Sequence, residues 1–297
     1  MTNIYEMKSF LSYDGCDLRY MVRGCGKPLV FIHGFASSSI DFSGLFKLLE
    51  HKYRIYALDQ RGFGQSPVSG NLGIESSARD LKALVDKEQL EDFNIIAYSM
   101  GAHVLFSYIE LFGEYKIGNI ILGEMSPKLI NEGDWSLGLY QGWYTRDIFE
   151  RDLKLMDRNY RKFNEYFLVQ TLISHCPEEK RDFLKEFDIN QWLDKLASRE
   201  KQYYAMIEVD ESQARINRQY WKTMVEGDYR SLIGHIKSPI CYIYGKPGSI
   251  YNPKLGEYYK KQLPNIKLYE FEDANHLLIY THRKAFVEVV DNFINEN

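Results

Sequence analysis

The sequence predicts an α/β protein with a mostly parallel, doubly wound sheet and an inserted helical segment. Two observations support this prediction. Four short, continuous apolar runs in the first half of the chain alternate with longer amphipathic stretches, and such runs are typical of parallel strands covered by helices on both faces. The alternation stops over 128–235 and resumes near the C-terminus.

Each element can be placed in order along the chain. Residues 8–13 and 17–23 flank Asp14-Gly15 and predict an antiparallel hairpin. The four apolar runs predict parallel strands over 28–32, 53–58, 94–97 and 118–122. The stretches between them predict helices over about 42–51, 76–90 and 101–113. Two more strands, over 239–244 and 267–271, and a last helix over about 282–295 complete the sheet and its cover.

Residues 128–235 differ from the rest of the chain. They are rich in Tyr, Trp and charged residues, have helical periodicity and contain few strand-like runs. We expect this segment to form a helical cap inserted between strands of one core domain, which would consist of residues 1–127 and 236–297.

The bulk composition limits the classes of function. A chain of 297 residues with 45% hydrophobic and 26% charged residues is ordinary for a globular protein with a sizeable core. A net charge of -4 gives no reason to expect nucleic acid or an anionic membrane as partner. The aromatic share of 15% suits a thick core or an aromatic pocket. We therefore expect a small-molecule substrate; the sequence does not indicate an oligomeric state.

No cofactor, metal or compartment signal is found. Cys16, Cys25, Cys176 and Cys241 lack metal-ligand spacing and are expected to be reduced thiols. No phosphate-binding glycine loop or zinc motif occurs. The N-terminus lacks a secretion-signal pattern, and no apolar run approaches the roughly 18 residues of a membrane span. The expected location is the cytoplasm.

Reactive side chains follow each of the four predicted strands. The strands end at His33-Gly34, at Asp59, at Tyr98-Ser99 and at Gly123-Glu124. Ligands of open parallel sheets bind at the carboxyl ends of the strands. The sequence therefore predicts that these residues gather at one edge of the sheet.

Ser99 is the candidate nucleophile. It is the central residue of the run AYSMG at 97–101, between a predicted strand and a predicted helix. The small neighbours Ala97 and Gly101 allow the sharp turn that exposes a serine hydroxyl in G-x-S-x-G motifs, although Ala97 replaces the first glycine. Five residues form a weak motif, and an ordinary serine on a strand-to-helix turn is the alternative.

Two backbone amides are candidates for stabilising an oxyanion. The amide of Met100 would lie at a helix N-terminus, where negative charge is favoured, and the amide of Phe35 would face it from the loop after the first parallel strand. We interpret His33 as a structural residue that fixes this loop.

Taken in order, these motifs resemble the α/β-hydrolase superfamily over nearly the whole chain. The run DQRGFGQS at 59–66 lies between the His33-Gly34 and Ser99 motifs, and Asn275-His276 follows near the end. The run EMSP at 124–127, followed by Asp134-Trp135, is similar to the non-haem chloroperoxidase-like or general hydrolase branch, whose name implies no haem. The resemblance implies that Asp59 and Arg61 are a loop-bracing pair.

The resemblance places the catalytic base at His276, ahead of the last helix, where Asn275 replaces the usual glycine. The remaining histidines are expected to be structural or exposed: His33, His51, His103, His175, His235 and His282.

The acid is displaced from its usual position in the superfamily. The loop after strand 239–244 has no carboxylate, and Gly248 or Ser249 stands where Asp is expected. The acid must orient the histidine from the same sheet edge, and Glu124 ends a neighbouring strand there. We therefore predict Glu124 as the acid, with Asp273 and Asp228 as weaker alternatives.

These residues predict a serine hydrolase that cleaves a carboxylic ester or related acyl bond of a small to medium apolar substrate through an acyl-enzyme. Carbon–carbon bond hydrolysis is an alternative, and so is a non-catalytic ligand receptor, because a fold does not fix a function. Four aromatic residues of the cap are candidates for an apolar acyl pocket or for packing of the cap onto the core: Trp135, Tyr140, Trp143 and Tyr144.

Overall fold

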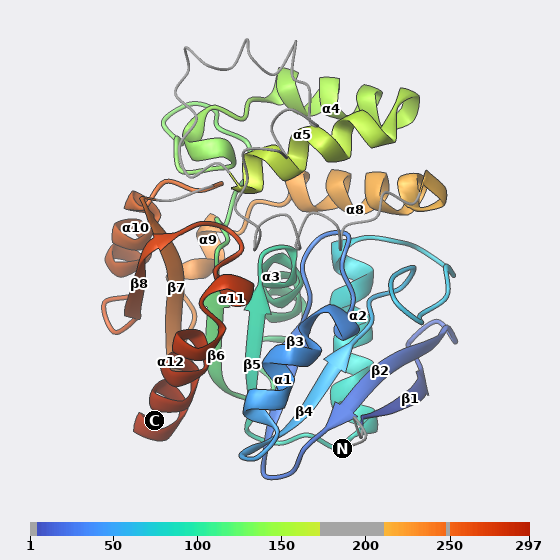
Figure 1. Cartoon of the computed structure of the whole chain (residues 1–297), viewed down its shortest axis with the longest axis vertical. Helices are drawn as coiled ribbons and strands as arrows, with labels where there is room; N and C mark the ends of the chain where they lie inside the picture. Colours follow the sequence, from blue (N-terminus) through green and yellow to red (C-terminus); the bar gives the residue numbers. More distant parts are fainter. Residues whose placement is uncertain (1–4, 173–210, 248–249) are drawn as a thin grey trace.

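The computed structural model describes residues 5–172, 211–247 and 250–297. Its centre is an eight-stranded sheet in the order β1-β2-β4-β3-β5-β6-β7-β8 (Figure 1). Its strands are β1 (Glu6–Leu11), β2 (Asp17–Arg23), β3 (Lys27–Ile32), β4 (Tyr53–Leu58), β5 (Phe93–Tyr98), β6 (Ile117–Gly123), β7 (Ile240–Pro247) and β8 (Lys267–Ala274). The pairs β1–β2 and β2–β4 are antiparallel and the others are parallel. The predicted α/β fold, including its N-terminal hairpin, is confirmed.

Helices cover both faces of the sheet, as the continuous apolar strands require. One face packs on α2 (Ile74–Lys87), α3 (Met100–Phe112) and α10 (Lys254–Gln262). The other packs on α1 (Ser43–Leu49), α11 (Leu278–Thr281) and α12 (Arg283–Glu296). All six residues of β5 are buried. The sequence pattern did not predict α10.

The segment between β6 and β7 is helical in its described part. It contains α4 (Arg146–Arg158), α5 (Tyr160–Leu172), α8 (Ala214–Glu226) and α9 (Arg230–Ile233). In Figure 1, α4, α5 and α8 lie across the end of the molecule toward which the arrow of β5 points. These helices therefore lie over the carboxyl edge of the sheet.

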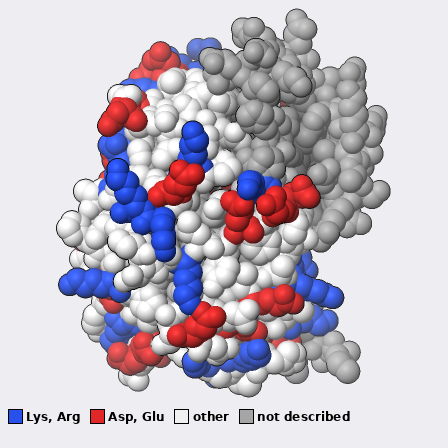
Figure 2. Space-filling view, turned by 90° about the vertical axis from the view of Figure 1, so that its left-hand side faces the viewer, with Lys and Arg blue, Asp and Glu red and all other residues white. Residues whose placement is uncertain are grey.

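On the side of the molecule shown in Figure 2, no large patch of charge of one sign is present among the described residues. Lys and Arg are interspersed there with Asp and Glu over the β8 and α10 side of the molecule. None of the helices in the described ranges has the length and apolar character that a membrane crossing needs.

Candidate active site

Ser99 lies at a sharp turn between β5 and α3. Its backbone has φ 53° and ψ -128°, a conformation that L-residues with side chains rarely adopt. The Ser99 amide donates to the carbonyl oxygen of Gly123 at 2.9 Å and helps to hold this turn. A Cβ at position 101 would lie 2.3 Å from the backbone oxygen of Ile32, so Gly101 is required for α3 to pass this close to β3.

Ser99, His276 and Glu124 form one chain of hydrogen-bond contacts. Nε2 of His276 lies 3.0 Å from Oγ of Ser99, and its Nδ1 lies 3.2 Å from Oε2 of Glu124. Glu124 is 2% exposed and His276 is 6% exposed. With a proton on Nδ1, the imidazole donates to the carboxylate and offers Nε2 as an acceptor to the serine hydroxyl.

Glu124 is fixed from two sides. Its backbone amide donates to the carbonyl oxygen of Ile243 at 3.1 Å, and its Oε1 accepts from the Gly245 amide at 2.6 Å. A carboxylate from the end of β6 therefore reaches the base across β7. Gly248 and Ser249, one of which was expected at the usual position of the acid, lie outside the described residues.

Two tyrosines surround the base. The hydroxyl of Tyr98 donates to the backbone oxygen of His276 at 2.8 Å, and the ring centroid of Tyr251 lies 6.1 Å from that of His276. Burial first, and then the negative charge of Glu124, raises the pKa of both tyrosines well above its ordinary value. Both hydroxyls therefore stay neutral, and Tyr98 can donate over the whole useful pH range.

The loop after β3 lies against Ser99. A Cβ on Gly34 would lie 3.3 Å from Cβ of Ser99, and the next residue, Phe35, lines the same cavity as Ser99. Met100 is the first residue of α3 and is fully buried. The two predicted amide donors thus come from segments that meet at the serine.

A cavity of about 180 Å³ opens beside Ser99 and His276. Its walls come from the loop after β3, from α5 and from the segment that follows His276. They are mostly apolar, through Phe35, Phe42, Phe167, Leu168, Leu277 and Tyr280. The α5 side of this wall was not predicted from the sequence.

The four predicted pocket aromatics are not among the residues that line this cavity. Trp135 packs on Tyr258, with ring centroids 5.0 Å apart, and donates from Nε1 to the backbone oxygen of Lys128. The ring centroid of Tyr140 lies 5.0 Å from that of Trp143 and 5.2 Å from that of Tyr144. These side chains pack the segment internally and onto the core, which was the alternative interpretation.

Other histidines have structural environments. Nε2 of buried His33 accepts from the Gln60 amide at 3.1 Å, and burial lowers the pKa of its imidazole. His103 contacts the backbone oxygen of Ser126 through Nε2 at 2.8 Å, and burial lowers its pKa to about 4. His175 lies outside the described residues.

The two alternative acids lie in other environments. Asp228 is bound by Arg230 at 2.8 Å and by Lys128 at 3.2 Å. Asp273 is exposed. Neither contact set includes His276, whereas Glu124 contacts it directly.

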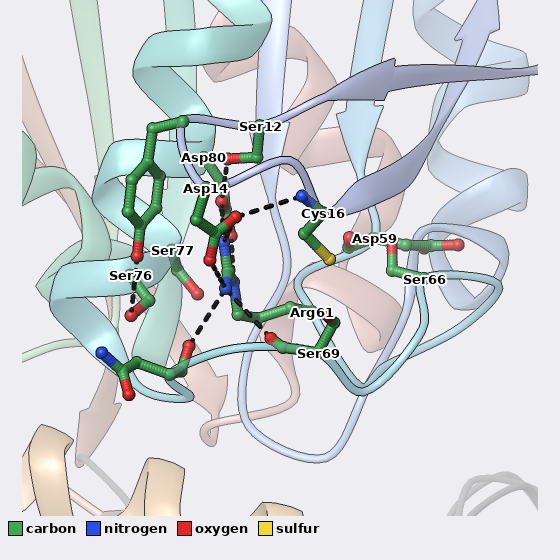
Figure 3. A network of polar contacts seen from close by, with 12 residues as sticks. Ser12, Asp14, Cys16, Asp59, Arg61, Ser66, Ser69, Ser76, Ser77 and Asp80 are labelled. Atoms are coloured by element: carbon green, nitrogen blue, oxygen red, sulfur yellow. Dashed lines mark hydrogen bonds and ion pairs between the residues drawn. The ribbon is translucent and has the colours of Figure 1, made fainter.

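Asp59 and Arg61 both brace loops, but each does so with other partners (Figure 3). Asp59 accepts from the amides of Ser39 at 2.7 Å and Gln65 at 2.9 Å. Arg61 is bound instead by Asp80 and Asp14. Both residues therefore brace loops, as expected, but they do so through separate partners and not through a contact with each other.

Fold and site together define the class of an α/β-hydrolase enzyme. Residues 27–283 match the family model described as the α/β hydrolase fold, and the chain belongs to that family. It is 23% identical over 272 residues to a pimeloyl-[acyl-carrier protein] methyl ester esterase of Aeromonas hydrophila, covering 91% of this chain and 96% of that one.

Two further similarities place the chain among its relatives. It is 28% identical over 156 residues to a putative non-heme chloroperoxidase of Synechocystis sp., which covers 51% of this chain and 54% of the relative. The structure of an esterase from Exiguobacterium antarcticum superposes with a TM-score of 0.80 at 19% identity, over 98% of this chain and 100% of that one. The predicted resemblance to the superfamily and to its chloroperoxidase-like branch is confirmed.

Proposed function

We propose that this protein is a serine hydrolase that cleaves a carboxylic ester, or a related acyl bond, of a small to medium apolar substrate through an acyl-enzyme. The observation that carries the proposal is the contact chain Ser99–His276–Glu124 at the wall of an apolar cavity. Esterases among the relatives support the hydrolytic class.

The mechanism follows from the roles of the three side chains. Nε2 of His276 removes the Ser99 proton as Oγ attacks the carbonyl carbon, and Glu124 stabilises the imidazolium through Nδ1. Backbone amides of Phe35 and Met100 donate to the resulting oxyanion. The imidazolium then protonates the leaving alcohol. A water molecule, deprotonated by the same nitrogen, attacks the acyl carbon. The bond between this carbon and Ser99 Oγ then breaks, the imidazolium returns its proton to Oγ, and the carboxylic acid leaves.

We further propose that residues 128–235 act as a cap that selects the substrate. Four residues of α5 line the same cavity as Ser99: Asn164, Phe167, Leu168 and Thr171. An acyl or alcohol group bound at the serine would therefore contact this segment.

Labelling of the nucleophile tests the proposal. A fluorophosphonate should modify Ser99. Ser99→Ala should abolish this modification and lower the rate of hydrolysis of short p-nitrophenyl esters by about 10⁴-fold or more. Ser37→Ala is a matched control, since Ser37 lines the same cavity but donates to Asp41. Absence of labelling in the folded wild-type protein would instead support a ligand receptor.

A further inference from the structure

The α5 wall of the cavity has one polar side chain without a partner. Asn164, Phe167, Leu168 and Thr171 are spaced i, i+3, i+4 and i+7, so they lie on one face of the helix. Two of them are apolar. The Thr171 hydroxyl already donates to the backbone oxygen of Leu168 at 2.7 Å.

Asn164 is the exception on this face. It is only 3% exposed, and its carboxamide has no hydrogen-bond partner among the residues that the structure describes. A carboxamide has two N–H donors and one acceptor oxygen, and buried polar groups of this kind nearly always find partners. The carboxamide of Asn164 is therefore available to a group that enters the cavity, water in the free protein or a polar group of a substrate.

Aromatic packing fixes the helix that bears Asn164. The rings of Phe163 and Phe167, on either side of it in sequence, lie 5.1 and 5.3 Å from the ring of Trp221 on α8. Phe35, which contributes the proposed oxyanion amide, contacts both Phe167 and Trp221 at 5.5 and 5.3 Å. The backbone that bears Asn164 is therefore held at a set place relative to the reaction centre, as a specificity group requires.

The charges around the cavity favour a neutral ligand. Asp41 is the charged side chain among the described lining residues, and no Lys or Arg is found among them. Asp41 accepts from the Ser37 hydroxyl at 2.7 Å and from the Ser38 amide at 2.8 Å. A carboxylate on the substrate would meet negative charge without a paired cation, whereas a neutral oxygen would not.

We propose that Asn164 is a specificity-determining residue that hydrogen-bonds a neutral oxygen function, a hydroxyl or carbonyl group, carried by the ester away from its scissile bond. This inference rests on the proposed hydrolase function. It narrows the substrate class from apolar esters to apolar esters with one additional uncharged oxygen group.

Matched substrates test the inference. The kcat/KM of p-nitrophenyl hexanoate is compared with that of its 4-oxo and 5-oxo analogues, in the wild type, in Asn164→Leu and in Thr171→Val. We expect the wild type to favour at least one oxo ester by about tenfold, the effect of one buried hydrogen bond. Asn164→Leu, which is similar in size but apolar, should remove this preference. Thr171→Val should change the ratio by less than about threefold.

The outcomes separate the inference from the proposed function. If no ester is turned over and Ser99 is not labelled, the hydrolase proposal fails. If esters are turned over but the wild type has no oxo preference, or both variants shift the ratio equally, the role of Asn164 is overturned. Should Asn164→Leu fail to fold, the wild-type ratio and the variant Asn164→Ser decide the question by the same criterion.

Discussion

Two buried ionic clusters of this molecule serve different ends. The first surrounds Arg61, which is fully buried and bonds Asp80 through Nε at 2.7 Å and Asp14 through Nη1 at 2.8 Å (Figure 3). Its Nη1 also donates to the backbone oxygens of Ser69 and Asn71 at 3.1 and 3.2 Å. The guanidinium is surrounded by acceptors, and the cluster joins the N-terminal hairpin, the 62–71 loop and α2.

The second cluster is the pair of Glu124 and His276. One carboxylate oxygen of Glu124 accepts from Gly245, and the other faces Nδ1 of His276. Among the described residues, Nε2 of His276 contacts only the hydroxyl of Ser99. Ser99 and His276 both line the cavity. Burial of charge is common to both clusters. What marks a candidate site is that one ring nitrogen remains directed at a reactive hydroxyl next to open space.

Removal of the acid should give the largest effect on activity. In Glu124→Gln the amide oxygen can still accept from the Gly245 amide. The imidazolium of His276, however, loses its negative partner, and the neutral ring loses the acceptor that fixes its tautomer. We expect kcat for p-nitrophenyl esters to fall by about 10⁴-fold with little loss of stability.

Asp273→Asn is the matched control, since it removes an exposed carboxylate three residues before His276. It should retain nearly wild-type activity. A Glu124→Gln enzyme within tenfold of the wild-type kcat would rule out Glu124 as the acid.

Breaking the first cluster should instead affect stability. Arg61→Met leaves the fully buried Asp80 carboxylate without its cation, and loss of one partner of a buried ion pair costs about 3–5 kcal/mol. Urea unfolding should show this decrease, while kcat per folded molecule changes little. Arg79→Met, which loses an exposed pair with Glu75 on the same helix α2 and a contact of its guanidinium with the Tyr13 ring at 5.9 Å, should cost about 1 kcal/mol. Equal losses in the two variants would contradict the structural role of Arg61.

The difference between the clusters explains what the sequence could and could not predict. Continuous apolar runs predicted the strands of the sheet, and a parallel sheet gathers the carboxyl ends of its strands at one edge. The proximity of Ser99, Glu124 and His276 could therefore be predicted from the sequence alone. The partner of Arg61 could not be predicted, because Asp59, Asp80 and Asp14 are all possible and only the path of the turn selects among them.

The cavity lining was harder to predict for a related reason. An aromatic-rich inserted helix can direct its aromatic side chains inward or toward the core, and helical periodicity does not distinguish the two. The predicted Trp135, Tyr140, Trp143 and Tyr144 pack away from the cavity, whereas α5 supplies its wall. The spacing of Asn164, Phe167, Leu168 and Thr171 was visible in the sequence, but nothing there placed this face beside Ser99.

A buried carboxylate outside both clusters, Asp152, offers a pH test of what charge burial costs. Asp152 on α4 is fully buried, and burial raises its pKa from 3.8 to about 6, although Arg151 and the Tyr144 hydroxyl oppose this shift. A raised acid pKa means that the folded state holds the proton more tightly than the unfolded state. Stability from this group is therefore lost as the pH rises from about 4 to about 6, by about 3 kcal/mol.

Asp152→Asn should remove that dependence. The free energy of unfolding of the variant, relative to wild type, is expected to increase by about 3 kcal/mol between pH 4 and pH 7. Asp157→Asn, which removes a half-exposed carboxylate from the same helix, controls for the change in helix charge. A constant difference between Asp152→Asn and wild type over this range would show that Asp152 is ionised as easily in the folded as in the unfolded chain.

The smallest expected effect on kcat comes from Tyr98→Phe, which tests whether the Tyr98 hydroxyl positions His276 or only contributes to stability. Tyr98→Phe removes the donor to the His276 backbone oxygen, and Tyr108→Phe removes an equally buried donor to the backbone oxygen of Tyr115, away from the site. Each should lower the free energy of unfolding by about 1 kcal/mol. Only Tyr98→Phe should also lower kcat, by less than about tenfold, because Glu124 and Ser99 still contact the ring of His276. Equal kcat values in the two variants would mean that the two ring contacts alone position the imidazole, and that the site cluster, like the Arg61 cluster, depends only on its own charged and polar partners.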